Sequence, residues 1–176
     1  MKKLLTLTFL AFSFFSSLQA ESTTAQQPVM SITDVNGTSY QITGTNEGLN
    51  IKGLEGKIIF LEFFGHRCPP CLASIPHLIK LQEKYKDKLT VIAVEVQGLN
   101  NTQLTQFVKE KGMNYIVVAD EKAGNFVNYI AQRAQWRGSI PFMVALDTKG
   151  NVQFVQAGML PESSLEELIK QLGPKK

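Results

Sequence analysis

The amino-acid sequence predicts an α/β domain in which a mixed β-sheet is flanked by helices. Two nearly uninterrupted apolar runs, at residues 57–64 and 89–96, are typical of strands that are buried on both faces of a sheet. Segments with apolar residues at helical spacing follow these runs. This alternation of strand and helix, which ends in a hairpin and a last helix, is the pattern of an α/β sandwich.

Each expected element has its own local signal. The expected strands cover residues 29–32, 39–43, 57–64, 89–96, 115–119, 142–146 and 152–156. The expected helices cover residues 68–85, 104–112, 126–134 and 163–172. Asn36-Gly37 predicts a turn between the first two strands, and Pro76 predicts a kink in the first helix. Ser163 and Glu166 predict a capping box at the start of the last helix.

Residues 1–20 have the layout of a secretory signal peptide. A basic start precedes an apolar run at residues 4–15, and small residues lead to Ala20. The run is shorter than the roughly 20 apolar residues of a spanning helix. Cleavage after Ala20 is expected to leave a periplasmic protein; the alternative is an uncleaved anchor in the inner membrane. We expect a flexible segment at 21–30 and one domain at 31–176.

The charge of the chain argues against a nucleic-acid partner. The formal net charge is +3, and removing Lys2 and Lys3 with the signal peptide lowers it by two, to +1. Proteins that bind nucleic acids usually carry a strong basic field, because phosphate contacts dominate their affinity. The remaining charges are interspersed as on an ordinary solvated surface, so we expect no nucleic-acid binding.

The two cysteines, Cys68 and Cys71, are separated by only two residues. A disulfide across so short a loop would constrain the unfolded chain little, so a structural role is weak and reactivity is the better explanation. Half a zinc site would look the same, but zinc needs two more ligands, and the only histidines are His66 and His77. We therefore expect no metal, and we expect His77 to be a surface or packing residue.

The position of Cys68 at the start of a predicted helix favours its thiolate. The unpaired N–H groups and the dipole of a helix N-terminus stabilise an anion, which lowers the pKa of a thiol there. Pro69 is tolerated in the first turn, and Pro70 restricts the turn further. Cys71 lies about one turn on and can attack a mixed disulfide on Cys68. The Cys68–Cys71 pair itself is then the redox group, and no other cofactor is expected.

Glu62 is the only charged residue inside the first long apolar run after its opening lysine, six residues before Cys68. Burial of an unpaired carboxylate raises its pKa, so Glu62 could take the proton of Cys71 as that thiol attacks. The alternative is that Glu62 faces a wet edge or pairs with a lysine. His66 either tunes the thiolate or is an ordinary loop residue, and the sequence leaves both open.

These residues resemble a known family. Residues 63–71 are similar to the active-site segment of thioredoxins, and residues 137–142 are similar to their cis-proline loop. Further segments resemble the additional part of the TlpA/ResA/DsbE group, at residues 91–94, 107–111 and 115–120. The resemblance implies a thioredoxin fold with an N-terminal β extension and a TlpA-like central insertion.

The resemblance also implies roles for individual residues. Cys68 would be the nucleophile and Cys71 the resolving thiol, while Glu62 matches the buried acid of thioredoxins. Many TlpA-like proteins carry an amide at that position. The peptide bond between Ile140 and Pro141 would be cis, and the backbone beside it would pair with the extended chain of a protein partner.

The sequence departs from the family at the residue before the first cysteine, where Arg67 replaces the usual tryptophan. A cation beside Cys68 should favour the thiolate further, but the flat apolar surface that tryptophan offers to partners is lost. We assign Arg67, with Ile140 and Pro141, to the substrate-binding surface. The sole tryptophan, Trp136, is expected to pack near the proline loop.

The leading hypothesis is a periplasmic disulfide reductase of exported proteins. The haem-binding cysteines of apocytochrome c are candidate substrates, and a membrane electron donor of the DsbD/CcdA type would be needed. A monomer is expected. A disulfide oxidase or isomerase is the alternative with the same chemistry, because the sequence does not fix the reduction potential. A thioredoxin-fold copper chaperone is the alternative of another class, although such proteins usually place three residues between their cysteines.

Overall fold

The computed structural model describes residues 27–173, so the expected signal peptide lies outside the described residues. The strands are β1 (Val29–Thr33), β2 (Ser39–Gly44), β3 (Leu49–Ile51), β4 (Ile58–Phe64), β5 (Leu89–Glu95), β6 (Ile116–Ala119), β7 (Phe142–Leu146) and β8 (Val152–Ala157). The helices are α1 (Pro69–Lys84), α2 (Asn101–Lys111), the 3-10 turn η1 (Asp120–Lys122), α3 (Phe126–Arg133) and α4 (Glu162–Leu172).

A five-stranded mixed sheet forms the centre of the fold, in the order β6-β5-β4-β7-β8. Strands β4, β5 and β6 are parallel, whereas β7 and β8 run antiparallel to their neighbours. Every residue of β4 and β5 is buried, which explains their continuous apolar sequence. The predicted mixed α/β sheet and the thioredoxin fold are confirmed.

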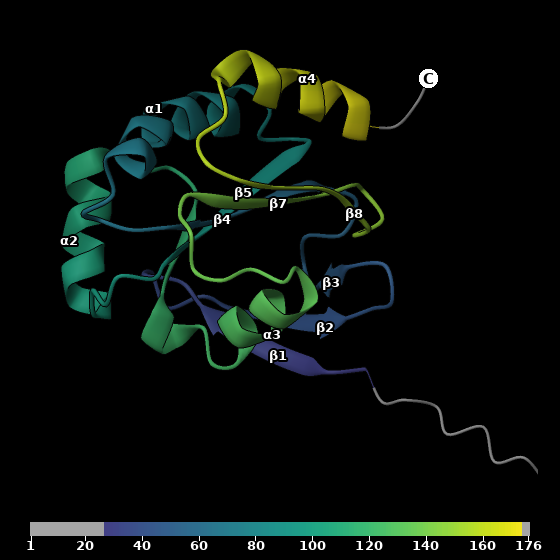
Figure 1. The fold of residues 1–176 in the computed structure, drawn as a ribbon, viewed down its shortest axis with the longest axis horizontal. Coiled ribbons are helices and arrows are strands. Elements are labelled where there is room, and N and C mark those ends of the chain that lie inside the picture. The colour runs from purple at the N-terminus through teal and green to yellow at the C-terminus, as the bar shows by residue number, and fades with distance from the viewer. Residues whose placement is uncertain (1–26, 174–176) are drawn as a thin grey trace, which may run out of the picture.

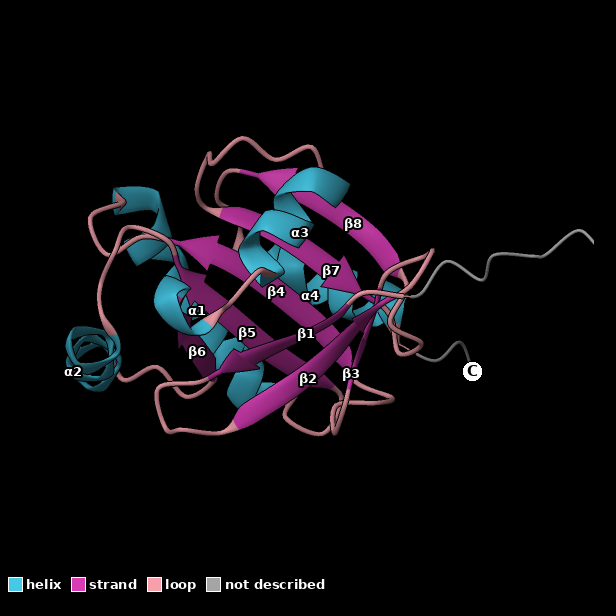
Figure 2. Cartoon of the chain, turned by 90° about the horizontal axis from the view of Figure 1, so that it is seen from below, coloured by secondary structure: helices cyan, strands magenta, loops and turns pink. Residues whose placement is uncertain are grey.

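The sheet is covered on both faces (Figure 1). Helices α1 and α4 lie on one face, and α3 with a separate sheet of β1, β2 and β3 lies on the other, as the view from below also shows (Figure 2). Two hydrophobic clusters result, one on each face. Both cysteines belong to the cluster beneath α1 and α4.

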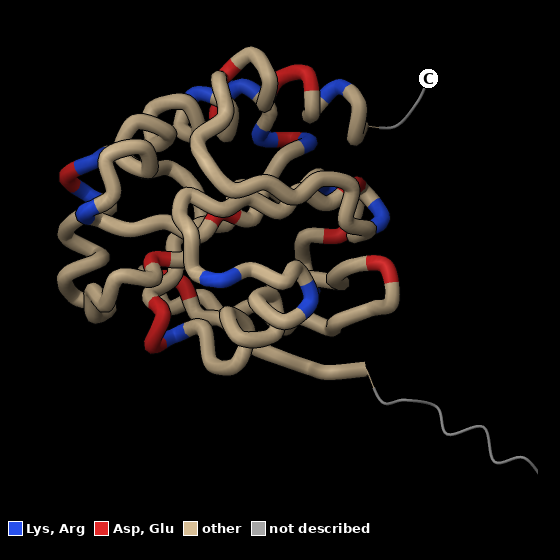
Figure 3. The backbone as a smooth tube through the Cα atoms, viewed as in Figure 1, with Lys and Arg blue, Asp and Glu red and all other residues tan. Residues whose placement is uncertain are grey.

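Charged residues lie mainly on the outside of these layers. Positions of both signs occur on α1 and α4, and basic and acidic positions are mixed over the rest of the described chain (Figure 3). Lys80 pairs with Glu162 at 3.2 Å and Lys84 with Glu166 at 2.6 Å, which joins the two helices at their exposed edges. In the described part of the chain, no helix is long and apolar enough to cross a membrane.

One local expectation is wrong, and two further features of the structure were not expected. The capping box at Ser163 and Glu166 is wrong: α4 begins one residue earlier, after Pro161, whose side chain has no oxygen to accept a hydrogen bond. A capping box does form at α2, where Asn100 and Gln103 bond each other's backbone N–H groups. Strand β3 has only three residues, too few to show the alternating pattern of a strand.

The N-terminal boundary of the domain also shifts. Val29 and Met30 belong to β1, although the expected flexible segment extended to residue 30. Met30 pairs with Ile42 of β2 and is buried in the cluster beside α3, so the ordered strand includes both residues. The rest of the expected segment, up to residue 26, lies outside the described residues.

Candidate active site

The cysteine pair lies where the central strand β4 passes into α1. Cys68 is the N-cap residue of α1, and its sulfur accepts a hydrogen bond from the N–H of Cys71 at 3.3 Å. Pro69 and Pro70 occupy the first two helical positions, where no intrahelical N–H bond is lost. Cys68 and Cys71 form a disulfide, with 7% of Cys68 and none of Cys71 exposed. The helix terminus therefore directs an N–H group at the more exposed sulfur, as expected.

The proline loop lies beside this pair. The peptide bond between Ile140 and Pro141 is cis, as the resemblance implies. The sulfur of Cys68 lies 3.8 Å from the backbone oxygen of Ile140. Antiparallel pairing of β7 with β4 sets Phe142 opposite Phe63, which brings this loop to the end of β4, just before the turn that leads to Cys68.

Trp136 packs against the base of the proline loop, as expected. Its ring stacks on Phe142 with the centroids 5.1 Å apart, and it lies 4.7 Å from the ring of Phe63. Its indole N–H donates to the backbone oxygen of Ser139 at 2.7 Å. The half-buried indole therefore supports the loop.

Glu62 lies behind the cysteines in the middle of β4 and is 3% exposed. Its Oε1 accepts a hydrogen bond from the hydroxyl of Ser74 on α1 at 2.9 Å. Burial raises the pKa of Glu62 from 4.5 to about 7, and the Ser74 hydroxyl partly opposes that rise. The alternatives of a wet edge or a lysine pair are therefore wrong, because the partner of this buried carboxyl is a serine.

Tyr115 extends the buried polar group around Glu62. Its hydroxyl is buried and has no hydrogen-bond partner in the described structure. Burial raises the pKa of Tyr115, and the charge of Glu62 raises it further. The phenol is therefore a neutral neighbour of Glu62.

Two residues of this region were missed from the sequence, Ser74 and Glu95. Glu95 is fully buried at the end of β5, and its Oε1 lies 2.8 Å from Nδ1 of His66. Glu95 closes an apolar run in the same way that Glu62 interrupts one, so the same pattern could have identified it. His66 lies in the loop before Cys68, and its ring is held there by the buried carboxylate of Glu95.

Arg67 is exposed in the turn before Cys68, and its backbone N–H donates to the side-chain oxygen of Gln97 at 2.8 Å. His77 is half-buried on α1. Within residues 27–173, no group of three or more histidine, cysteine or acidic side chains is placed to hold a metal ion.

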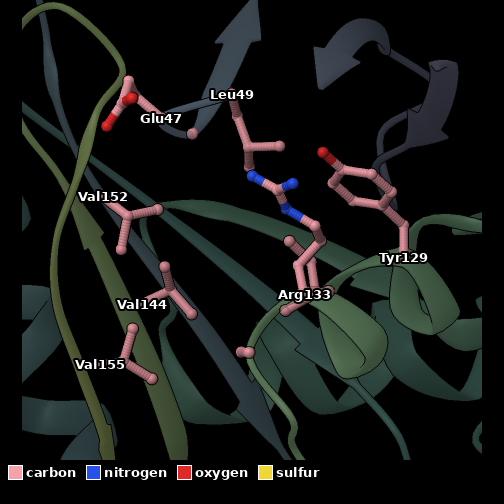
Figure 4. A pocket seen from close by; sticks show the side chains of 10 residues that line it. Glu47, Leu49, Tyr129, Arg133, Val144, Val152 and Val155 are labelled. Carbon is pink, nitrogen blue, oxygen red and sulfur yellow. The ribbon is translucent and has the colours of Figure 1, made fainter. Parts of the chain in front are cut away.

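A pocket of about 170 Å³ lies on the opposite face of the sheet from the cysteines, between α3 and strands β7 and β8 (Figure 4). Leu49, Val144 and Val152 give it an apolar lining. Arg133, at its rim, donates to the backbone oxygens of Thr45 and Asn46 at 3.2 and 2.7 Å. The guanidinium is thus used to hold the loop before β3, and none of the redox residues lines this pocket.

Comparison with known proteins gives a family match over most of the chain. The family model described as Redoxin matches residues 26–169. The thiol–disulfide oxidoreductase ResA of Halalkalibacterium halodurans is 29% identical over 168 residues, which cover 94% of this chain and 88% of that protein. The thioredoxin-like protein YneN of Bacillus subtilis is 28% identical over 129 residues, which cover 72% of each chain.

Solved structures share the fold. A thioredoxin-family thiol:disulfide interchange protein of Chlorobium tepidum superposes with a TM-score of 0.62 at 24% identity, covering 84% of this chain and 94% of that one. The exposed lipoprotein thioredoxin Etrx1 of Streptococcus pneumoniae gives a TM-score of 0.64 at 19% identity, covering 82% of this chain and 100% of that one. At these identities the likeness establishes the fold alone.

Proposed function

Because the chain belongs to the Redoxin family and is a thiol–disulfide oxidoreductase, we propose that it reduces disulfides of exported proteins in the periplasm. The observation that carries the proposal is the arrangement of three groups. Cys68 lies at the N-terminus of α1 and Cys71 is buried one turn further on. Glu62, with a pKa of about 7, is buried in β4 and bonds Ser74, whose hydroxyl also bonds the backbone oxygen of Cys71. This arrangement supplies a nucleophile, a resolving thiol and a proton acceptor.

The reduction proceeds in two exchanges. The Cys68 thiolate attacks one sulfur of the partner's disulfide, so a mixed disulfide forms and one partner thiolate leaves. Cys71 then gives its proton to Glu62 and attacks the Cys68 sulfur, which releases the second partner thiolate and closes the Cys68–Cys71 bond. Two electrons pass to the partner, whose thiolates take protons from solvent.

The partner chain is placed by the loop beside Cys68. The half-buried Ile140 and the buried Pro141 border the more exposed sulfur, so an extended segment can pair with the backbone there. Arg67 is exposed in the turn immediately before the nucleophile and contributes a cation to the same surface. Pro69 and Pro70, the two residues after Cys68, are also exposed.

The reductase direction requires a supply of electrons from outside the domain. A membrane donor of the DsbD/CcdA type would regenerate the Cys68–Cys71 dithiol, because each turnover leaves the protein as the disulfide. The relative named ResA supports this assignment at the level of thiol–disulfide exchange. We further propose export by the N-terminal segment, action as a monomer, and the haem-binding cysteines of apocytochrome c as one substrate class.

Trapping the redox state in cells tests the direction. Cells are quenched with acid, free thiols are alkylated with a reagent that adds mass, and the protein is separated by size. A reductase fed by a donor is found mostly as the dithiol, whereas an oxidase is found mostly as the disulfide. Cys68→Ser should abolish reduction of a model disulfide protein. Undiminished reductase activity in this variant would refute the role of the pair, and a predominantly oxidised pool would refute the direction.

A further inference from the structure

We propose that Glu95 is a positioning residue that holds the turn before Cys68, so that this sulfur stays on the N-terminus of α1. The inference rests on the proposed role of Cys68 as nucleophile and adds a residue that acts on it from the neighbouring strand. Glu95 contacts neither cysteine in the described structure, and it acts through His66 and Gln97, whose own contacts reach the turn.

The carboxylate of Glu95 accepts hydrogen bonds from two loops, the one that follows β4 and the one that follows β5. Glu95 ends β5, in register with Phe64 at the end of β4, and is fully buried. Four donors converge on its carboxylate, two from His66 and two from the backbone after β5. The ring Nδ1 and backbone N–H of His66 donate to Oε1 at 2.8 and 3.3 Å, the N–H of Gln97 to Oε1 at 3.1 Å, and the N–H of Leu99 to Oε2 at 2.9 Å.

Gln97 forms a second connection between the same two loops. Its side-chain oxygen accepts the backbone N–H of Arg67 at 2.8 Å, one residue before Cys68. Gly65 leaves room for this contact, because a Cβ at that position would overlap the side-chain amide of Gln97. Gly98 has a φ of +89°, the left-handed region that favours glycine, and lies between the two N–H groups that both donate to Glu95.

The three residues between β4 and Cys68 are therefore each constrained from the β5 side, at Gly65 by close packing and at His66 and Arg67 by hydrogen bonds. The stabilisation of an anion at a helix terminus falls off within the first turn, so it depends on where the sulfur lies relative to the N–H groups. A turn released from Glu95 would let Cys68 move away from the N–H of Cys71, which lies 3.3 Å from its sulfur.

An amide cannot replace the carboxylate in this place. Glutamine offers one oxygen and an NH2 group. With the NH2 group at the Oε2 position the N–H of Leu99 loses its acceptor, and with the NH2 group at the Oε1 position the donors of His66 and Gln97 lose theirs. Glu95→Gln is therefore expected to loosen the turn even though it keeps the size of the side chain. The change also removes a negative charge near the thiolate. Removing that charge alone would lower the pKa of the Cys68 thiol, whereas movement of the sulfur away from the N-terminus of α1 would raise it.

The test measures the Cys68 thiol directly in the reduced full-length protein. The rate of alkylation by iodoacetamide is followed against pH, and the reduction potential is measured against glutathione. Glu95→Gln should raise the pKa of the Cys68 thiol and slow its alkylation at pH 7 on the order of tenfold. Gln97→Ala, which changes no charge, should act in the same direction with a smaller effect. It also provides the test if Glu95→Gln does not fold.

Asp34 supplies the matched control. It is 5% exposed and accepts the N–H groups of Asn36 and Thr38 at 2.9 and 2.8 Å, in the turn between β1 and β2. Asp34→Ala should lower the melting temperature because the buried acceptor Oδ1 is lost, while alkylation of Cys68 stays unchanged. An unchanged or lowered pKa of the Cys68 thiol in Glu95→Gln and Gln97→Ala would overturn the inference. Because alkylation needs no protein partner, this readout is independent of the proposed reductase direction.

Discussion

Glu62 and Glu95 lie on the neighbouring strands β4 and β5, and both are almost completely buried, but their hydrogen-bond partners differ. Glu62 has one hydroxyl donor, from Ser74, and its pKa is raised to about 7. Glu95 accepts from an imidazole ring and three backbone N–H groups. The two buried carboxyl groups thus differ in the number of donors that bond them, and this difference underlies the roles proposed above, proton transfer for Glu62 and positioning for Glu95.

The difference follows from where each residue lies along its strand. Glu62 is in the middle of β4, where the backbone N–H groups of the strand are used in the sheet, and its hydrogen-bond donor is a side chain of α1. Glu95 is the last residue of β5, and the chain beyond it turns and directs its N–H groups back at the carboxylate. The first position suits proton transfer, and the second suits positioning.

The largest expected effect is on the pH dependence of the stability of the oxidised protein, which Glu62 should control. Between pH 4.5 and 7 the folded protein keeps the proton of Glu62, which the unfolded chain has released, so the free energy of unfolding falls as the pH rises. Glu62→Gln has no such proton to lose. At pH 8 it should be more stable than the natural protein by about 3 kcal/mol, which is the shift from 4.5 to about 7 converted at 1.36 kcal/mol per pKa unit.

Urea unfolding of both oxidised proteins at pH 4, 6 and 8 measures this difference. The two proteins should unfold at similar urea concentrations at pH 4, where the carboxyl is protonated in both states, and diverge as the pH rises. A difference in the free energy of unfolding that is the same at every pH would mean that Glu62 does not titrate between pH 4 and 8.

Glu95→Gln is expected to be less stable than the natural protein, because an amide cannot satisfy all four donors of this carboxylate.

The rate of the second exchange gives the next largest effect. With Glu62 as the proton acceptor, release of the partner from the mixed disulfide on Cys68 should accelerate as the pH rises through about 7. Glu62→Gln should slow this step on the order of 10²-fold at pH 8 and abolish the rise near pH 7. Single-turnover release of a chromogenic thiol from a preformed mixed disulfide measures the step apart from the first attack. A retained inflection near pH 7 in the variant would assign it to another group.

The residues of the candidate site were easier to identify from the sequence than the contacts that hold the turn before Cys68. Cys68, Cys71 and Glu62 follow from short-range patterns, because a helix start and a charge inside an apolar run are visible locally. Glu95 meets His66 only because two parallel strands end side by side, 29 residues apart in sequence. Contacts between loops of this kind depend on the register of the sheet, which the residue pattern of either strand does not specify.

The same reasoning applies to β3 and to the start of α4, two places where the secondary structure differs from the prediction. Strand β3 is fixed by its pairing with β2 rather than by any pattern of its own three residues. The start of α4 could not be read from Ser163 and Glu166, because the spacing of a capping box also occurs inside a helix that began earlier. The long buried strands β4 and β5 were placed to within a residue, since their apolar runs are set by burial on both faces.

The smallest effect concerns Ser74, the single donor to Glu62. Its hydroxyl lies 2.9 Å from Glu62 Oε1 and 2.8 Å from the backbone oxygen of Cys71, and one hydroxyl hydrogen must serve both acceptors. Ser74→Ala should therefore raise the pKa of Glu62 above 7 by at most about one unit, since a hydrogen bond contributes roughly 1 kcal/mol net.

The same single-turnover assay measures the effect of Ser74→Ala. At pH 7 the second exchange should be a few times slower than in the natural protein, because less of Glu62 is ionised, and the two rates should converge above pH 9. Convergence is the internal control, since a general loss of packing around Cys71 would slow the step at every pH. A profile shifted toward lower pH would show that the hydroxyl does not stabilise the Glu62 carboxylate, and the contrast between one donor at Glu62 and four at Glu95 would then not account for their roles.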